Sequence, residues 1–216
     1  MNFRKMLAVM AVCAVIISAG FILPSCRSNG AEQESDTDAP GIEPMNFADT
    51  DLSEYIILGE YKGLTVISDG DAAERSDALW QRVVSGVTVK KYPEQQVDYY
   101  FSQSVKKYQY YARISDNTYE YVLEHYGMTE EKMLEEARKM VLEDMVFYAI
   151  ARAENIELTD SEKTANFDRY VEKYVESYGY TETYVRSYMS EYIYETMLFD
   201  KTMEALLSWN TVTGTG

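Results

Sequence analysis

Cysteine is nearly absent from this chain, since its 216 residues include only Cys13 and Cys26. Cys13 lies inside an N-terminal apolar run that we expect to be removed, which leaves Cys26 as the single thiol of the mature protein. One cysteine cannot form an intramolecular disulfide, so an exported domain of this sequence has to be stabilised by its hydrophobic core alone.

Histidine is scarcer still, because His125 is the only one. The shortage of His and Cys excludes the zinc sites that these residues build. The sequence also lacks the HExxH, GxSxG and phosphate-loop motifs of common hydrolases and nucleotide-binding enzymes. We interpret His125 as a capping or packing residue near Gly127. We therefore predict no catalytic residue, no metal and no cofactor; an enzyme of an unrecognised type is the alternative.

Positive charge is in short supply as well. The chain has 20 Lys and Arg against 36 Asp and Glu, for a formal net charge of −16. Such a surface repels nucleic acid and anionic lipid headgroups, so we expect no nucleic-acid partner. It attracts basic segments of other polypeptides, although most of the carboxylates are interpreted as a solvated acidic surface.

The first 25 residues have the parts of a secretory signal peptide. Arg4-Lys5 is a positive start, and an uncharged apolar run follows from Met6 to Leu23. The run ends in Leu23-Pro24-Ser25-Cys26, which resembles the bacterial lipobox, where the cysteine is diacylated and becomes the mature N-terminus. We predict a lipoprotein signal peptide at residues 1–25 and a lipid anchor at Cys26 that holds the protein on the extracytoplasmic face of the cell membrane. A plain N-terminal membrane anchor is the alternative.

Residues 26–50 contain few large apolar residues and many acidic, Ser, Gly and Pro residues. This composition is typical of disorder, and we predict a disordered tether over the whole range.

Beyond residue 50 the apolar residues recur at three- and four-residue steps, and no proline occurs after Pro93. This pattern predicts a mainly α domain over residues 51–212. The domain also includes a short N-terminal extended segment at Tyr55–Leu58 and Leu64–Ile67. The central helix is apolar almost all round in its second half, so it needs neighbours on several sides. The predicted helices span 77–85, 93–112, 117–126, 130–154, 160–178 and 182–208.

Tyrosine is the residue in excess. There are 20, and all but two lie between Tyr92 and Tyr194. Two sets of tyrosines stand at four-residue steps, each along one helix face. The first is Tyr170, Tyr174 and Tyr178, and the second is Tyr184, Tyr188 and Tyr192. One interpretation is core packing; the other is a concave wall, between the C-terminal helices and the helix near Tyr92–Ala112, that contacts unfolded chains. The candidate polypeptide-binding residues are Tyr100, Tyr108, Tyr111, Tyr170, Tyr174, Tyr178, Tyr184, Tyr188, Met189 and Tyr192.

Three stretches carry a family resemblance. They are Leu58-Gly59-Glu60-Tyr61-Lys62-Gly63-Leu64, Val89-Lys90-Lys91-Tyr92-Pro93-Glu94, and Tyr148-Ala149-Ile150-Ala151 through Asn155-Ile156. In this order and spacing, Tyr55–Val66 and Leu79–Val212 resemble trigger factor, the ribosome-associated bacterial chaperone. The resemblance implies a helical C-terminal body with two arms, as in trigger factor and SurA.

Two parts of that family are missing from the resemblance. No stretch resembles the ribosome-binding domain, so we expect no ribosome partner. The dozen residues between Val66 and Leu79 are too few for an FKBP-type prolyl isomerase, because a domain needs at least about 50 residues. SurA and the foldase lipoproteins of Gram-positive bacteria carry parvulin domains, which are also absent.

The resemblance and the N-terminal segment together imply a membrane-anchored chaperone that binds unfolded or exported polypeptides without ATP and without prolyl isomerase activity. A structural or adaptor lipoprotein that holds one specific folded partner is the alternative.

Overall fold

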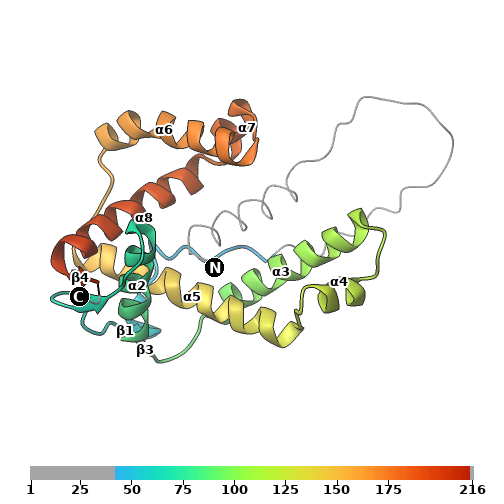
Figure 1. The fold of residues 1–216 in the computed structure, drawn as a ribbon, viewed down its shortest axis with the longest axis horizontal. Coiled ribbons are helices and arrows are strands. Elements are labelled where there is room, and N and C mark those ends of the chain that lie inside the picture. The colour runs from blue at the N-terminus through green and yellow to red at the C-terminus, as the bar shows by residue number, and fades with distance from the viewer. Residues whose placement is uncertain (1–41, 215–216) are drawn as a thin grey trace.

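The computed structural model describes residues 42–214. The predicted signal peptide at 1–25, Cys26 and most of the predicted tether lie outside the described residues. The described part is mainly α-helical, as predicted, with two arms extending from a shared base (Figure 1). The elements are the 3-10 helix η1 (Leu52–Glu54), β1 (Ile56–Ile57), β2 (Thr65–Ile67), α2 (Ala72–Ser85), β3 (Thr88–Val89), α3 (Glu94–Ile114), α4 (Tyr119–His125), α5 (Glu130–Ala153), α6 (Asp160–Tyr178), α7 (Glu182–Tyr188), α8 (Ser190–Trp209) and β4 (Thr211–Thr213).

The base holds the largest hydrophobic core. The second half of α5 packs there against α2 and the C-terminal half of α8. Trp80 of α2 is 1% exposed and meets Phe199 of α8 edge to face, with ring centroids 5.4 Å apart; Phe147 of α5 contacts Phe199 in the same way. These aromatic contacts join three helices that are distant in sequence.

Two small sheets close the base. The predicted extended segments do not pair with each other: β1 pairs antiparallel with β3, and β2 pairs parallel with β4 at the end of the chain. The chain leaves β1 through Gly59, where an added Cβ would lie 2.2 Å from the carbonyl oxygen of Gly86. Glycine is therefore required at Gly59, one of the residues on which the family resemblance depends.

The first arm consists of α3, α4 and the first half of α5. Its own small core contains Tyr108, Ala112, Val122 and Met133. The second arm consists of α6, α7 and the first half of α8, around a separate core. An apolar row along α7 and α8 is buried there: Val185, Met189, Ile193 and Met197 are all less than 5% exposed.

Two predicted helix boundaries are wrong. The single helix predicted over 182–208 is two helices, because the backbone turns at Met189 (φ −117°, ψ 7°), and the hydrogen-bond pattern restarts with α8. The side chain of Met189 is buried at this break, and α7 packs beside α6. The helix predicted from residue 77 begins at Ala72, since Asp71 and Glu74 form a reciprocal capping box. The other predicted helices agree with the structure within two residues at each end.

The predicted tether is wrong at its C-terminal end. Phe47 is 4% exposed and packs against Tyr148 of α5. The guanidinium group of Arg152 donates hydrogen bonds to the carbonyl oxygens of Phe47, Ala48 and Thr50 at 3.1, 2.6 and 2.6 Å. We call residues 45–50 the strap. The polar composition of the strap predicted disorder, but the strap is ordered by contacts with α5. Phe47 is buried, and Arg152 forms hydrogen bonds with the carbonyl oxygens of the strap.

The packing of the strap against α5 can be tested by mutation. Phe47→Ala should lower the free energy of unfolding by about 3 kcal/mol, because it removes a buried aromatic side chain. Ile42→Ala is the matched control, since Ile42 lies just before the strap and is 42% exposed, and it should change little. Equal urea midpoints for both variants and the wild type would show that the strap is not packed in solution.

Candidate functional site

The two arms face each other across the base, and tyrosines paired with carboxylates line the place where they meet. Tyr100 of α3 donates a hydrogen bond to the carboxylate of Asp144 on α5. One helical turn further along α5, Tyr148 donates to Glu195 of α8 at 2.8 Å. We call these four residues the tyrosine–carboxylate cluster. It joins α3 of the first arm to α8 of the second arm.

The carboxylates of this cluster are hard to ionise. Desolvation raises the pKa of Asp144 to about 7; Glu195 and Glu143 add to this, against the opposing hydrogen bond from Tyr100. Desolvation also raises the pKa of Glu195, and the negative charge of Glu191 raises it further. Part of the Glu195 side chain nevertheless reaches solvent. Among residues 42–214, no Lys or Arg forms an ion pair with either Asp144 or Glu195. The cluster is thus a site of uncompensated negative charge above neutral pH.

The same environment holds the neighbouring tyrosines in their neutral form. Desolvation followed by the charge of Asp144 raises the pKa of Tyr100 well above its ordinary value. Desolvation and Glu195 do the same for Tyr148. The hydroxyls therefore stay protonated at physiological pH, and each donates its one proton to the neighbouring carboxylate.

The predicted tyrosine row on α6 is only partly a surface feature. Tyr170 and Tyr174 are 6% and 5% exposed, and their hydroxyls reach Asp200 (2.8 Å) and Thr196 (3.5 Å) of α8. Tyr178, the third member, is 43% exposed. The core interpretation therefore applies to the first two tyrosines of this row.

The row that begins on α7 is more exposed and continues a chain of aromatic contacts. Tyr178, Tyr180, Tyr184 and Tyr188 follow one another with centroid distances of 6.2, 5.6 and 5.3 Å. Tyr188, at the end, is 71% exposed. We call these four residues the arm-tip stack. Sequence spacing missed Tyr180, because it lies in the loop between α6 and α7.

The remaining candidates lie in three places. Tyr192 is half-buried and meets Tyr174 edge to face, whereas Met189 is buried in the second-arm core. Tyr108 and Tyr111 pack together with Tyr126 at the end of the first arm. The structure thus brings Tyr100 near the base, Tyr108 and Tyr111 to one arm, and the other candidates to the second arm.

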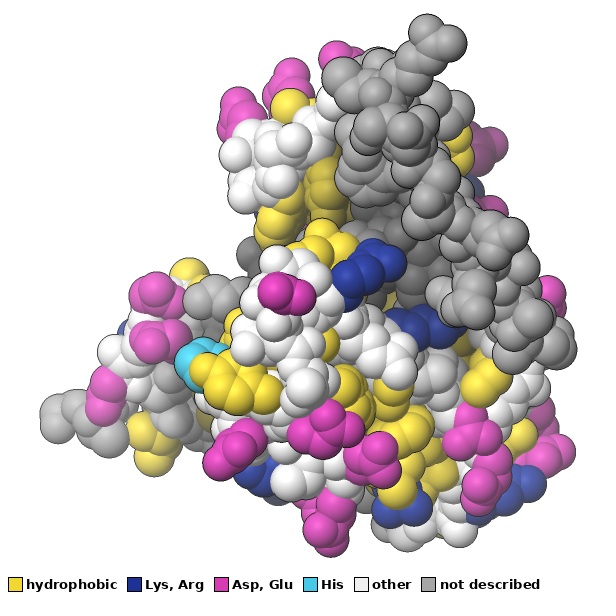
Figure 2. All heavy atoms as spheres, turned by 90° about the vertical axis from the view of Figure 1, so that its right-hand side faces the viewer, with side chains coloured by type: hydrophobic (Ala, Val, Ile, Leu, Met, Phe, Trp, Pro, Cys, Tyr) yellow, Lys and Arg dark blue, Asp and Glu magenta, His cyan; other side chains and the backbone are white. Residues whose placement is uncertain are grey.

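Seen from the ends of the arms, hydrophobic side chains are exposed between the upper and lower parts of the molecule, and acidic ones gather along the lower edge (Figure 2).

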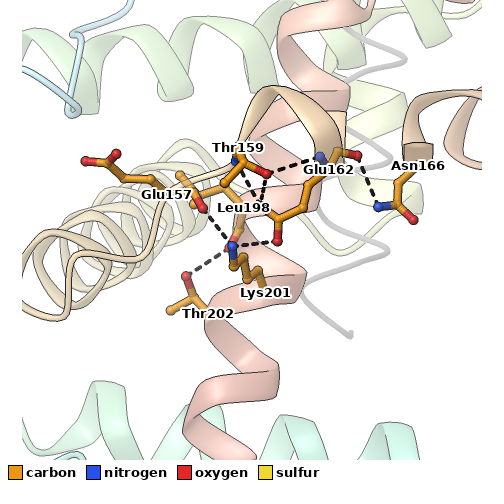
Figure 3. Close-up of polar contacts among 7 residues, drawn as sticks. All are labelled: Glu157, Thr159, Glu162, Asn166, Leu198, Lys201 and Thr202. Carbon is orange, nitrogen blue, oxygen red and sulfur yellow. Dashed lines mark hydrogen bonds and ion pairs between the residues drawn. The ribbon is translucent and has the colours of Figure 1, made fainter. Parts of the chain in front are cut away.

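A polar contact holds the second arm in place at its root. The ammonium group of Lys201 on α8 donates to the carbonyl oxygen of Glu157 at 2.8 Å and to the carboxylate of Glu162 at 2.6 Å (Figure 3). The same carboxylate caps α6 by accepting from the backbone N–H of Thr159. Hydrogen bonds from Lys201 and Thr159 lower the pKa of Glu162 to about 2. The ion pair between Lys201 and Glu162 at the root is therefore present across the physiological pH range.

Within residues 42–214, no three His, Cys, Asp or Glu side chains are grouped so that they hold a metal ion. In the same range, no helix combines the length and apolarity needed to span a bilayer. His125 is exposed at the end of α4 and stacks on Tyr121, with ring centroids 6.2 Å apart.

The raised pKa of Asp144 makes folding stability depend on pH. Because the folded-state pKa lies above the unfolded value, the contribution of Asp144 is present at low pH and is lost as the pH rises through about 7. Between pH 5 and pH 8 the wild type should lose about 2 kcal/mol relative to Asp144→Asn, as measured by urea unfolding. Asp98→Asn, at an exposed position on α3, should follow the wild-type profile. Parallel profiles for wild type and Asp144→Asn would contradict the assignment.

Comparison with known proteins agrees with this architecture. Residues 69–208, more than half of the chain, match the family model described as bacterial trigger factor protein (TF) C-terminus. A trigger factor from Caldicellulosiruptor saccharolyticus is 30% identical over an alignment of 132 residues, and the match covers 55% of this chain and 29% of that protein. The chain thus spans less than a third of the length of this relative. On the family match, the chain belongs to the trigger factor C-terminal family.

Proposed function

We propose that this protein is an ATP-independent chaperone that binds unfolded or exported polypeptides between its two arms. The observation that carries the proposal is the arm-tip stack, in which four tyrosine rings run along the end of the second arm and become exposed at Tyr178 and Tyr188. Membership in the trigger factor C-terminal family supports it.

A row of exposed tyrosines suits a partner without fixed structure. Each ring offers a large contact area with little loss of side-chain entropy, and its hydroxyl bonds to whichever backbone group lies nearby. No single contact is strong, so binding depends on several at once and stays reversible.

Charge selects among the clients. The tyrosine–carboxylate cluster lies between the roots of the arms, and Glu172, Glu176 and Glu191 are exposed on the helices of the second arm. Basic segments of unfolded chains are therefore favoured, and their binding weakens as salt screens the attraction.

The proposed activity is binding without catalysis. The chain passes from β2, which ends at Ile67, to α2, which begins at Ala72, through a short turn. This turn has no room for an isomerase domain, and a chaperone of this design acts by covering apolar segments of its client. We place it on the extracytoplasmic face of the membrane, held through Cys26 and without a ribosome partner, because of the signal-like N-terminal sequence.

The arm-tip stack is tested by changing its exposed members. The double variant Tyr178→Ser/Tyr188→Ser of the full chain should bind a reduced, unfolded model protein about tenfold more weakly, because each aromatic contact contributes about 0.5–1.5 kcal/mol. Fluorescence anisotropy of the labelled client measures affinity, and light scattering measures the suppression of its aggregation.

The matched control is Ile57→Ser/Ile67→Ser, which removes two side chains that are 53% and 65% exposed on the strands of the base. It should leave client binding unchanged. Helical content and melting temperature are measured first for both variants. Wild-type protection by the tyrosine variant, or one tight folded partner in place of many clients, would refute the proposal.

The membrane anchor has its own test. The wild type should partition into the detergent phase and carry acyl chains on Cys26 by mass spectrometry, because two chains bind a bilayer stably. Cys26→Ala should accumulate as the uncleaved precursor. A mature protein that begins at another residue and carries no lipid would show that the segment is a different kind of signal.

A further inference from the structure

The strap is attached to α3 and α5 through its main chain. Besides the three carbonyl oxygens that Arg152 binds, the backbone N–H of Met45 donates to the side-chain oxygen of Gln96 at 2.6 Å. Just before the strap, the side-chain amide of Gln95 donates to the carbonyl oxygen of Glu43 at 3.1 Å. Within the described part of the chain, no hydrogen bond joins a strap side chain to either helix. Main-chain hydrogen bonds of this kind give affinity for a polypeptide without fixing its sequence.

One side chain of the strap is deeply buried. Phe47 is 4% exposed and packs against the ring of Tyr148, with ring centroids 6.1 Å apart. Met45 is half-buried and contacts the same core. Asn46 and Ala48, on either side of Phe47, are exposed. The surface beneath the strap therefore selects for one aromatic side chain and leaves its neighbours in solvent.

The strap makes its own turn. The side chain of Asn46 accepts from the backbone N–H of Ala48 at 3.0 Å and donates to the carboxylate of Asp49 at 2.7 Å. The hydroxyl of Thr50 donates to the carbonyl oxygen of Asn46 at 2.6 Å. A segment that is shaped by its own contacts and held by one buried ring can detach locally, because such opening costs less free energy than global unfolding.

The surface that receives the strap adjoins the place where the arms meet. Gln96 is 2% exposed and lies one helical turn before Tyr100 on α3. Tyr148 contacts Phe47 with its ring, and its hydroxyl donates to Glu195 of α8. The strap thus lies beside the tyrosine–carboxylate cluster, next to the region that the proposed clients occupy.

We propose that this surface, formed by Gln95, Gln96, Tyr148 and Arg152, is a peptide-binding site whose built-in ligand is the strap. We call it the strap site. A client segment with one aromatic side chain replaces the strap: its ring takes the place of Phe47, and its carbonyl oxygens accept from Arg152. The inference rests on the proposed function in one respect, namely that the replacing segment belongs to a client, and it adds a second site beside the arm-tip stack.

The test uses a labelled peptide of residues 43–51 and the full chain with Phe47→Ala, which weakens the strap and leaves the strap site intact. This variant should bind the peptide about tenfold more tightly than the wild type, because an occupied site lowers the apparent affinity by the fraction that is open. A peptide that itself carries Phe47→Ala should bind the variant about tenfold more weakly, since it lacks the buried ring. Fluorescence anisotropy measures each affinity.

The hydrogen bonds to the main chain are tested in the same variant. Adding Arg152→Gln should weaken the peptide about tenfold, because it removes the charged donor of three hydrogen bonds. Adding Arg138→Gln, at an exposed position of α5, should leave its affinity unchanged. Helical content is measured first. If Phe47→Ala lowers it, Asn46→Gly replaces it as the strap-weakening change, since the Asn46 side chain forms hydrogen bonds only within the strap.

Replacement by a client is the last step. A reduced, unfolded model protein should release the bound peptide from the Phe47→Ala chain. Three results would overturn the proposal: no gain in peptide affinity when the strap is weakened, equal affinity for the peptide without the ring, or a client that binds and leaves the peptide in place. The third result would leave the proposed function standing. A client that binds nowhere would refute the proposed function and the replacement with it, while the peptide titration alone still shows whether the strap site exists.

Discussion

The burial of the second half of α5 is the constraint on which the rest of the structure depends. From Met140 to Ala151 this helix presents apolar side chains in nearly every direction, and most are almost inaccessible to solvent. A helix of this kind is stable only if several other elements cover it. Here α2, α3, α8 and η1 do so. Both arms begin from elements that cover α5, which is why one packed helix sets the positions of two projecting structures with separate cores.

Local periodicity was enough to predict the helices, because it records which face of each helix is buried. It failed where the structure depends on a partner that is distant in sequence. Phe47 is buried because its ring packs against Tyr148 and its carbonyl oxygen accepts a hydrogen bond from Arg152. Both partners lie on α5, so the sequence of the strap alone does not predict this contact. The break at Met189 is similar: the apolar row continues through it without interruption, since all its members face the same core. The start of α2 depends on no distant partner, because Asp71 and Glu74 stand at the spacing of a capping box in the sequence.

The tyrosines show the same limit at the level of the candidate site. Four-residue spacing establishes that Tyr170, Tyr174 and Tyr178 share a face, but it does not say how far the neighbouring helix extends. Tyr170 and Tyr174 lie over α8, where Asp200 and Thr196 accept or share hydrogen bonds with their hydroxyls. Tyr178 lies beyond that contact and is exposed. One sequence pattern thus serves the core at one end and the surface at the other, and only the tertiary packing divides it.

The distribution of charge over the helices bears directly on the proposed binding of clients. Among residues 42–214, carboxylates without ion-pair partners collect where the arms meet, and the proposed preference for basic clients rests on this charge. On α6, Arg169 and Lys173 lie over the ring of Tyr170. Tyrosine contacts charged groups in two ways here. Hydroxyls of Tyr100 and Tyr148 donate hydrogen bonds to Asp144 and Glu195, whereas the ring face of Tyr170 lies under the two cations. Leucine at these positions would supply similar apolar area but neither a hydroxyl donor nor a ring face that attracts cations.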